Sequence, residues 1–439
     1  MTMRLGRLIA PYSLGLLLVC NSVAQTTLPA EETLTEAWSM ALANDRIVAA
    51  VDADLEAAQA AERAARAARF PRLETTASYA RYTEAPSLEL VTPVFAFRSP
   101  VIFDDNDTVL ASAQLSLPLF TGGTLSAGIS ASKDNRRAAE ASRVQVLADL
   151  KLDVASRYIT LLRAERTLSA AAAAAESLSA HVRDVEAMLE RDLVARSDLL
   201  AARVTFANAE QQRLKAENTL QLARALYNRR LGEPLNRAAK LSSLPDNGTL
   251  DGRSIDELIE ISQRNRPETT ILAAQARALG AQARAERGKL LPQVALVGRY
   301  DHLETTILDR EDFTSVGVGV RWTMFDGGQT RQRARALQRQ GKAVELRLAD
   351  LRSLLEVEVQ EALLAIVEAD ARRAVARAAV AEADENLRIS RELYGAGLAT
   401  NTLVLEAVTL QESASGNRDD ASFDAQFSRL RLAHAIGEL

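Results

Sequence analysis

Two segments of the chain alternate apolar and polar residues with a period of two, which is typical of β-strands. The odd positions of residues 109–119 and the even positions of residues 316–324 are mostly Val, Ala, Leu, Trp and Met, with small or polar residues between them. Each segment follows a partner of similar length, at residues 72–82 and 293–301, so two β-hairpins are expected. Strands of about ten residues with one apolar and one polar face are typical of a membrane barrel with a wet interior. A soluble hairpin with one buried face shows the same pattern.

Helical patterns fill most of the remaining chain. Residues 122–192 and 327–394 contain no proline, and each predicts a helix of about 70 residues, a rod on the order of 100 Å long. After a short break, each returns in a helix of about 35 residues that ends at Gly232 or Gly437. Each hairpin is preceded by a short and a longer helix, and the short helices open with the expected capping boxes Thr33 with Glu36 and Ser254 with Glu257.

The turn from strand to helix carries a pair of glycines in both places. Gly122, Gly123, Gly327 and Gly328 allow the backbone to turn sharply, because glycine adopts conformations that other residues avoid. Thr121 and Asp326 immediately precede these pairs, and their side chains are predicted to cap the long helices.

The chain is one structural unit made twice. The Phe-Thr-Gly-Gly sequence at residues 120–123 returns as Phe-Asp-Gly-Gly at residues 325–328, a shift of 205, whereas Asn44 returns as Asn265, a shift of 221. The first copy therefore has 221 − 205 = 16 extra residues, which we assign to an exposed loop around residues 84–108. The predicted organisation is a signal peptide at 1–24, a first repeat at 25–232, a linker at 233–253 and a second repeat at 254–439.

These elements set an assembly problem. Very long helices with a narrow apolar stripe need coiled-coil partners, and four strands cannot close a barrel. If three chains share one tube, 4 × 3 = 12 strands form a closed sheet with no free edge. The expected fold is mainly α with a small β part: long coiled-coil hairpins forming an α-barrel, and a 12-stranded β-barrel shared by three chains.

The first 24 residues are typical of a secretory signal. Arg4 and Arg7 precede an apolar run at residues 8–20, and a small residue, Ala24, offers a cleavage site. Cys20, the only cysteine, keeps lipidation open as an alternative. The chain has a formal net charge of −5 with both signs mixed throughout, which argues against nucleic-acid binding.

No constellation of residues indicates catalysis. His181, His302 and His434 lack metal-ligand spacing, and two of them lie in predicted helices, where packing or surface roles are the simplest interpretation. The chain has no phosphate-binding glycine-rich loop with lysine and no nucleophile beside a base. We therefore predict no enzymatic activity, no metal and no cofactor.

The ordered, duplicated set of motifs resembles the TolC or outer-membrane efflux protein family over about residues 31–439. It comprises the helix stops at Pro71 and Pro292, the strand-to-helix turns, and the turn at residues 394–400, whose sequence is Tyr-Gly-Ala-Gly-Leu-Ala-Thr. The resemblance implies a homotrimer in the outer membrane of a Gram-negative bacterium, in contact with its lipid and extending into the periplasm. It also implies a periplasmic membrane-fusion adaptor and an inner-membrane transporter of the RND or ABC class as partners.

The resemblance places a gate and a docking tip at the two helix turns. Tyr394 and Glu406 match gate positions of the family. Leu403 occupies a position where members often carry a second carboxylate, so that ring is absent there, and Asp198 takes the equivalent place in the first copy. Ala399 stands where some members carry a bridging arginine. Glu406 is expected to ring a narrow opening, although a solvated helix charge is the plainer interpretation. The docking tip, where glycines permit close approach but also simply end a helix, comprises Leu193, Val194, Ala195, Arg196, Ser197, Gly395, Gly397, Leu398, Ala399, Thr400 and Asn401.

The function expected from this resemblance is a passive exit duct for an efflux or secretion machine. The alternatives from other classes are a periplasmic coiled-coil scaffold that conducts nothing and an envelope hydrolase. The sequence does not distinguish a drug, a metal or a protein as the exported cargo.

Overall fold

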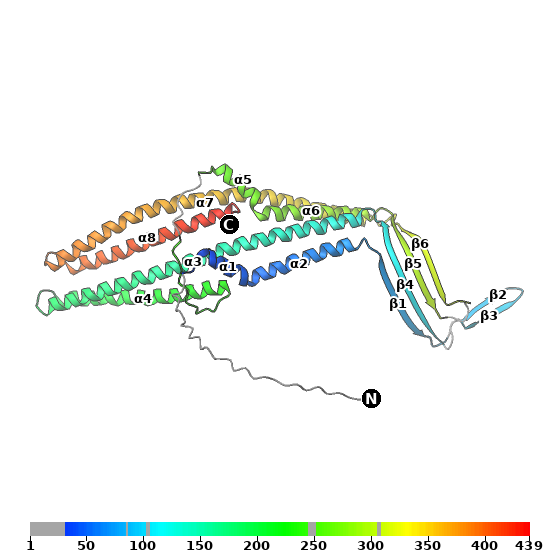
Figure 1. The fold of residues 1–439 in the computed structure, drawn as a ribbon, viewed down its shortest axis with the longest axis horizontal. Coiled ribbons are helices and arrows are strands. Elements are labelled where there is room, and N and C mark those ends of the chain that lie inside the picture. Colours follow the sequence, from blue (N-terminus) through cyan, green and yellow to red (C-terminus); the bar gives the residue numbers. More distant parts are fainter. Residues whose placement is uncertain (1–30, 85–86, 102–105, 245–251, 305–308) are drawn as a thin grey trace, which may run out of the picture.

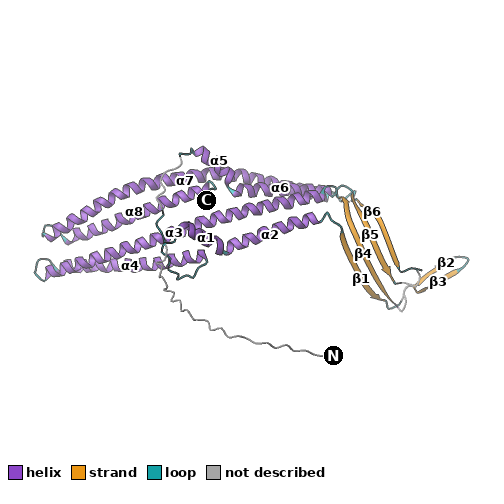
Figure 2. Ribbon diagram, in the orientation of Figure 1, coloured by secondary structure: helices purple, strands orange, loops and turns teal. Residues whose placement is uncertain are grey.

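The structure, a computed structural model, is an elongated rod of helices with a β-sheet at one end. It describes residues 31–84, 87–101, 106–244, 252–304 and 309–439. Helices run along the rod and strands continue from one of its ends (Figures 1 and 2). The predicted class, mainly α with a small β part, is confirmed.

The helices occur in the same order in both halves of the chain. Their lengths are 11, 22, 66 and 36 residues in the first half and 11, 22, 67 and 35 in the second. At 1.5 Å per residue the longest are about 100 Å long. They are α1 (Leu34–Asn44), α2 (Arg46–Ala67), α3 (Thr124–Leu189) and α4 (Arg196–Leu231), then α5 (Ile255–Asn265), α6 (Pro267–Gly288), α7 (Gln329–Gly395) and α8 (Asn401–Ala435).

The starts of the helices follow from local chemistry. Thr33 and Glu36 form the expected capping box of α1, and Ser254 accepts the Glu257 amide at the start of α5. The predicted caps of the long helices are wrong by two residues, because Gly123 and Gly328 occupy the cap positions with φ of 82° and 84°. Glycine reaches this left-handed conformation without strain. Asp326 still accepts the Gly328 and Thr330 amides at 2.9 and 2.8 Å.

The main sheet has four antiparallel strands in the order β1-β4-β5-β6. Their bounds are β1 (Arg72–Arg81), β4 (Asp107–Phe120), β5 (Gln293–Leu303) and β6 (Asp312–Arg321). Both predicted hairpins are confirmed, and β4 with β5 joins the two halves. The last strand ends at Arg321 rather than at Met324 as predicted. Arg321 pairs with Gln293, the first residue of β5, and Pro292 before it has no N–H to extend the ladder.

We predicted that the extra residues of the first half form a loop, and this prediction is wrong in part. They contain a separate two-stranded hairpin of β2 (Ser87–Val91) and β3 (Ala96–Val101), which extends beyond the main sheet in Figure 1. The turn is closed by Thr92, whose hydroxyl oxygen accepts the Phe95 amide at 3.1 Å and whose own amide donates to the Phe95 carbonyl at 2.9 Å. The exposed tip of the predicted loop is retained, since Val94 and Phe95 are exposed.

The two faces of the main sheet differ in polarity. Residues directly opposite each other in the ladder point to the same face, so the register assigns every position. One face carries Leu73, Ala77, Tyr79, Val109, Ala111, Ala113, Leu115, Leu117, Leu296, Val316, Val318 and Val320. The other carries Arg72, Glu74, Thr76, Ser78, Ser112, Gln114, Ser116, Arg299, Asp301, Ser315 and Arg321. The predicted alternation is therefore confirmed in β4 over residues 109–117 and in β6 over residues 316–321. At the strand ends distant from the helices the two faces are mixed: the first face also carries Arg81, Asp107, His302 and Asp312, and the second also carries Leu110, Leu303 and Phe313.

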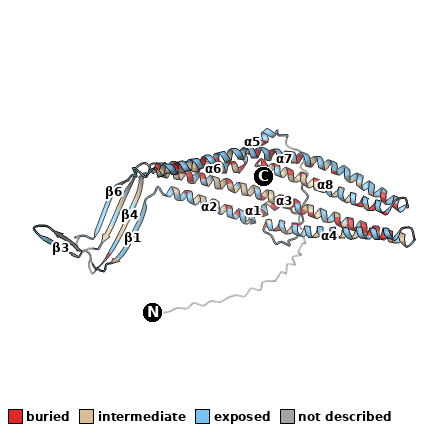
Figure 3. Ribbon diagram, turned by 180° about the vertical axis from the view of Figure 1, so that it is seen from behind, coloured by how far each residue is buried: buried red, intermediate tan, exposed pale blue. Residues whose placement is uncertain are grey.

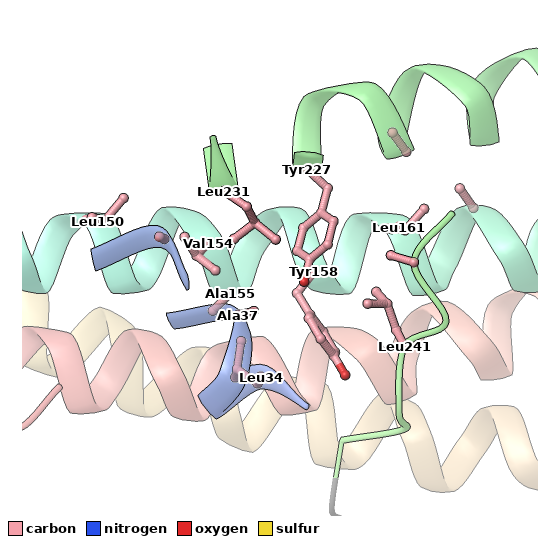
Figure 4. Close-up of a cluster of buried hydrophobic side chains, with 14 of the residues drawn as sticks. Leu34, Ala37, Leu150, Val154, Ala155, Tyr158, Leu161, Tyr227, Leu231 and Leu241 are labelled. Atoms are coloured by element: carbon pink, nitrogen blue, oxygen red, sulfur yellow. The ribbon is translucent and has the colours of Figure 1, made fainter. Parts of the chain in front are cut away.

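The core of the rod is a narrow stripe of small and branched residues between the helices (Figure 3). Its thickest part lies near the middle, where α1, α3, α4 and the segment after α4 meet around Tyr158 and Tyr227 (Figure 4). There the Glu32 carboxylate is buried and binds Tyr227 and Arg237, while Tyr158 donates to the Ser242 carbonyl at 2.6 Å. The sequence analysis missed this polar cluster.

Candidate gate at the helical tip

Both helix turns lie at the end of the rod opposite the sheet (Figure 2). The two turns have the same geometry. Asp192 and Gly397, which are 205 residues apart, both have positive φ, 58° and 72°. In each turn the next amide donates back to the helix, from Leu193 to the Met188 carbonyl at 3.0 Å and from Leu398 to the Leu393 carbonyl at 2.8 Å. The repeat therefore extends to the backbone of the tip.

A buried polar contact joins the two halves of the chain just inside the tip. The His181 Nε2 of α3 lies 2.6 Å from the Asn401 Oδ1 of α8. The Asn401 Nδ2 donates to the Asp198 carbonyl at 3.1 Å. His181 is 8% exposed and Asn401 3%. The amide nitrogen of Asn401 is already bonded to Asp198, so its oxygen faces the ring and can accept a hydrogen bond from His181 Nε2–H.

Tyr394 packs against this contact. Its ring centroid lies 5.4 Å from that of His181, and it belongs to an apolar cluster with Val185, Leu199 and Val404. Burial, followed by the negative charges of Asp198 and Asp184, raises the pKa of the Tyr394 hydroxyl above its ordinary value. The hydroxyl is therefore neutral at physiological pH and has no protein partner among the described residues. Tyr394, His181 and Arg391 help to line an open pocket of about 700 Å³.

The predicted gate residues do not all lie in one place. Tyr394 is buried in the apolar cluster, and Asp198 is half-buried and near enough for its charge to act on the Tyr394 hydroxyl. Leu403 and Glu406 lie on the exposed side of α8. These two side chains therefore face solvent in the single chain, and their part in a gate stays a prediction.

Most of the predicted docking residues are exposed, two are half-buried and one is buried. Leu193 is 68% exposed and Leu398 77%. Ala195, Arg196, Ser197, Gly395, Gly397 and Thr400 are also exposed, and Val194 and Ala399 are half-buried. Asn401 was predicted to belong to the docking tip, but the structure buries its side chain against His181. It is unavailable to a partner in this conformation.

His181, which was predicted to be a packing or surface residue, is a buried packing residue with a polar partner. Ala174, Leu178 and Val185 share its buried helix stripe. A histidine within such a stripe needs a polar partner, and that signal was present. Its partner, Asn401, is 220 positions away and no local pattern identifies it.

The four turn glycines have different surroundings. A Cβ on Gly122 would lie 2.3 Å from the Gly288 carbonyl oxygen, and its φ is +61°. Gly327 has a φ of +67°, but a Cβ there would meet nothing within 4 Å. The first turn is therefore packed against the end of α6, while the second is open in the single chain.

The other two histidines, His302 and His434, lie far from the tip. His302 Nδ1 lies 3.0 Å from an Asp312 oxygen at the edge of the sheet, and His434 Nε2 lies 2.8 Å from an Asp149 oxygen. Within the described ranges, no three His, Cys, Asp or Glu side chains are grouped to hold a metal ion. The helices that the structure describes include none that is both long and apolar enough to cross a membrane.

Comparison with known proteins identifies a family and a shared fold. A family model described as outer membrane efflux protein matches residues 37–232 and 258–438. The cobalt-zinc-cadmium resistance protein CzcC of Cupriavidus metallidurans is 24% identical over 223 residues, 51% of this chain and 52% of that protein. The match thus spans about half the length of this curated relative.

Solved structures match over nearly the whole chain. The outer membrane protein VceC of Vibrio cholerae has a TM-score of 0.77 at 20% identity, covering 92% of this chain and 96% of that one. The outer membrane channel CmeC of Campylobacter jejuni has a TM-score of 0.78 at 16% identity, with coverages of 92% and 85%. At these identities the likeness shows the fold.

Proposed function

The chain belongs to the outer membrane efflux protein family, and from that premise we propose that three copies form a passive exit duct across the outer membrane. The sheet crosses the membrane with its apolar face toward lipid, and the helices extend into the periplasm. The observation that carries this proposal is the amphipathic sheet with two open edges. A sheet of this kind at the end of helices about 100 Å long suits a shared barrel, because closure satisfies the edges.

The alternative of a non-conducting periplasmic scaffold accounts less well for this sheet. A scaffold needs only the coiled coils, whereas Val316, Val318 and Val320 are all more than 60% exposed in the single chain. Exposed apolar area of this kind marks an interaction site with lipid or protein. An outer-membrane duct places this apolar area against lipid, whereas a periplasmic scaffold gives it no role.

The tip is proposed to dock a periplasmic adaptor, which connects the duct to an inner-membrane transporter of the RND or ABC class. Its two exposed leucines, one on each helix turn, support this proposal. A crosslinker attached through Leu398→Cys in intact cells is expected to capture a periplasmic adaptor, identified by mass spectrometry. Ser353→Cys, exposed in the middle of α7, is the matched control. Equal capture by both variants, or capture of outer-membrane proteins alone, would contradict docking at the tip.

Glu406 is proposed to contribute, with its copies in the other two chains, to a ring of carboxylates at the periplasmic mouth. Such a ring attracts cations and repels anions. Replacing Glu406 with glutamine is therefore expected to lower the cation preference of the channel in planar bilayers by about two-fold or more. Glu412→Gln, the same change about 1.7 turns further along α8, is expected to leave it nearly unchanged. Identical selectivity in wild type and Glu406→Gln would remove Glu406 from the constriction.

The cargo is determined by the partners in this account, because a wide aqueous duct binds little. The likeness to CzcC, a protein named for cobalt, zinc and cadmium resistance, favours metal cations as one cargo class. A negatively charged mouth at Glu406 suits cations as well.

A further inference from the structure

The two outer strands of the main sheet, β1 and β6, have open edges in the described structure. We propose that β6 of one chain pairs antiparallel with β1 of a second copy in one specific register. This inference rests on the proposed three-chain duct. In that register Val318 lies directly opposite Tyr79 of the second copy. The residue pairing follows from the internal repeat.

The repeat preserves individual contacts, not only the order of elements. In the first hairpin Arg72 pairs with Ser116. Adding 221 to the first number and 205 to the second gives Gln293 and Arg321, which are paired in the second hairpin. The two shifts therefore carry the strand register of one half onto the other without error.

Side-chain contacts obey the same shifts. The Tyr79 hydroxyl donates to an Asp107 carboxylate oxygen at 2.8 Å, and the Tyr300 hydroxyl donates to Asp312 at 2.5 Å. These are the same pair, since 79 + 221 = 300 and 107 + 205 = 312. The shifts of 221 and 205 therefore relate side-chain contacts as well as backbone pairs in the two halves of the sheet.

The joint between the halves supplies the template for the joint between chains. Within the chain β4 pairs with β5, and Ala113 lies opposite Tyr300. The residue of β6 equivalent to a residue of β4 has a number higher by 205, and the residue of β1 equivalent to a residue of β5 has a number lower by 221. The pair therefore becomes Val318 opposite Tyr79, and by the same shifts Leu115 opposite Gly298 becomes Val320 opposite Ala77.

The predicted register keeps the faces of the sheet consistent. Val318 and Tyr79 both lie on the apolar face, and they are 63% and 62% exposed in the single chain. A slip of one residue would place the apolar face of one chain beside the polar face of the next. Only slips of two residues keep the faces matched, and these would displace the attached helices by about 6.8 Å along the strand.

At the base of the sheet, the strand-to-helix turns have different neighbours in the two seams. Within the chain the turn at Gly122 lies against Gly288, and the Thr124 hydroxyl donates to the Ala285 carbonyl at 3.2 Å. The shifts place the open turn at Gly327 against Ala67 of the second copy. A Cβ at the Gly288 position would lie 2.6 Å from the facing carbonyl, and Ala67 carries one. The seam between chains is therefore wider at this level than the seam within a chain.

Paired cysteines test the register directly. Cβ atoms of directly opposite residues are about 4.5–5.5 Å apart and those of diagonal neighbours about 7–8 Å, so a disulfide favours the opposite pair. The only natural cysteine is Cys20, in the expected signal peptide. Tyr79→Cys combined with Val318→Cys is expected to give covalent trimers on non-reducing gels of oxidised outer membranes.

The controls are the pairs that a two-residue slip would join, Val318→Cys with Ala77→Cys and Val318→Cys with Arg81→Cys. The predicted pair is expected to crosslink at least about five-fold more than either, given the difference in Cβ separation. Ala77→Cys with Val320→Cys, in the same register, repeats the test if the first variant does not assemble. Higher yield from a slipped pair overturns the register.

The outcome is separable from that of the duct itself. Crosslinked trimers that carry no current, even when adaptor and transporter are added, would uphold the register and contradict the exit duct. Conducting channels in which neither predicted pair crosslinks would overturn the register and leave the duct intact. Bonds formed between β6 and another protein would identify a different occupant of the edge and also overturn the proposal.

Discussion

Replacing Val318 with arginine is expected to remove the protein from the outer-membrane fraction. Val318 lies in the middle of β6 on the apolar face of the sheet and is 63% exposed in the single chain. A charged side chain facing lipid near the bilayer midplane costs about 2–4 kcal/mol per site, and a trimer contains three such sites. Membrane fractionation and gel analysis of the unheated trimer measure the effect.

Gly317→Arg is the matched control for this change. The neighbouring residue points to the opposite, polar face, and a Cβ on Gly317 would meet nothing within 4 Å. The same arginine is therefore expected to be tolerated there, in contact with water. If both variants assemble normally, β6 does not face lipid; if both fail, the substitution disrupts the sheet without regard to its faces.

Replacing Gly288 with alanine is expected to destabilise the joint between the two halves of the chain. The new Cβ would lie 2.6 Å from the Gly122 carbonyl oxygen and 3.0 Å from the Thr124 nitrogen. Both are main-chain atoms in a tight turn, so relief requires backbone movement. Overpacking of this kind costs about 1–3 kcal/mol. Thermal unfolding of the purified protein, followed by circular dichroism, is expected to show a lower midpoint.

Gly280→Ala, in the interior of the same helix, makes the opposite prediction. Its Cβ would meet only the end of the Arg284 side chain, at 3.9 Å. Alanine is a better helix former than glycine by about 1 kcal/mol, so this variant is expected to be as stable as the wild type or more so. Equal midpoint temperatures of unfolding for Gly288→Ala and Gly280→Ala would show that the Gly122–Gly288 contact does not limit the stability of the protein.

The long elements were predictable because their signals are local and repeated. Proline-free runs with glycine ends predict α3 and α7, and alternation predicts the strands. Their ends were less predictable, since they depend on partners. The last strand stops where Pro292 interrupts the neighbouring strand, and the caps move to Gly123 and Gly328 because their φ angles are positive. The β2–β3 hairpin was missed because the described residues of the second half hold no copy of it, and its residues were assigned to an exposed loop.

The candidate gate was predictable only in part. Tyr394 was identified by resemblance, and the structure adds the cluster in which it is buried. The His181–Asn401 contact and the burial of Glu32 depend on residues about 200 positions apart meeting in the fold. In the second half, Leu363 and Leu432 occupy the positions equivalent to Tyr158 and Tyr227. The polar cluster therefore could not be predicted from the repeat.

The central claim is that this protein conducts, and single-channel recording from the purified protein in planar bilayers tests it most directly. We expect discrete conductance steps from the assembled trimer, with a preference for cations that Glu406→Gln reduces. Protein that is inserted in the bilayer as a trimer and passes no current, at any voltage the bilayer tolerates and without any partner added, would contradict an exit duct that is open by itself. If current is still absent when adaptor and transporter are added, the conduit is contradicted and the scaffold is favoured.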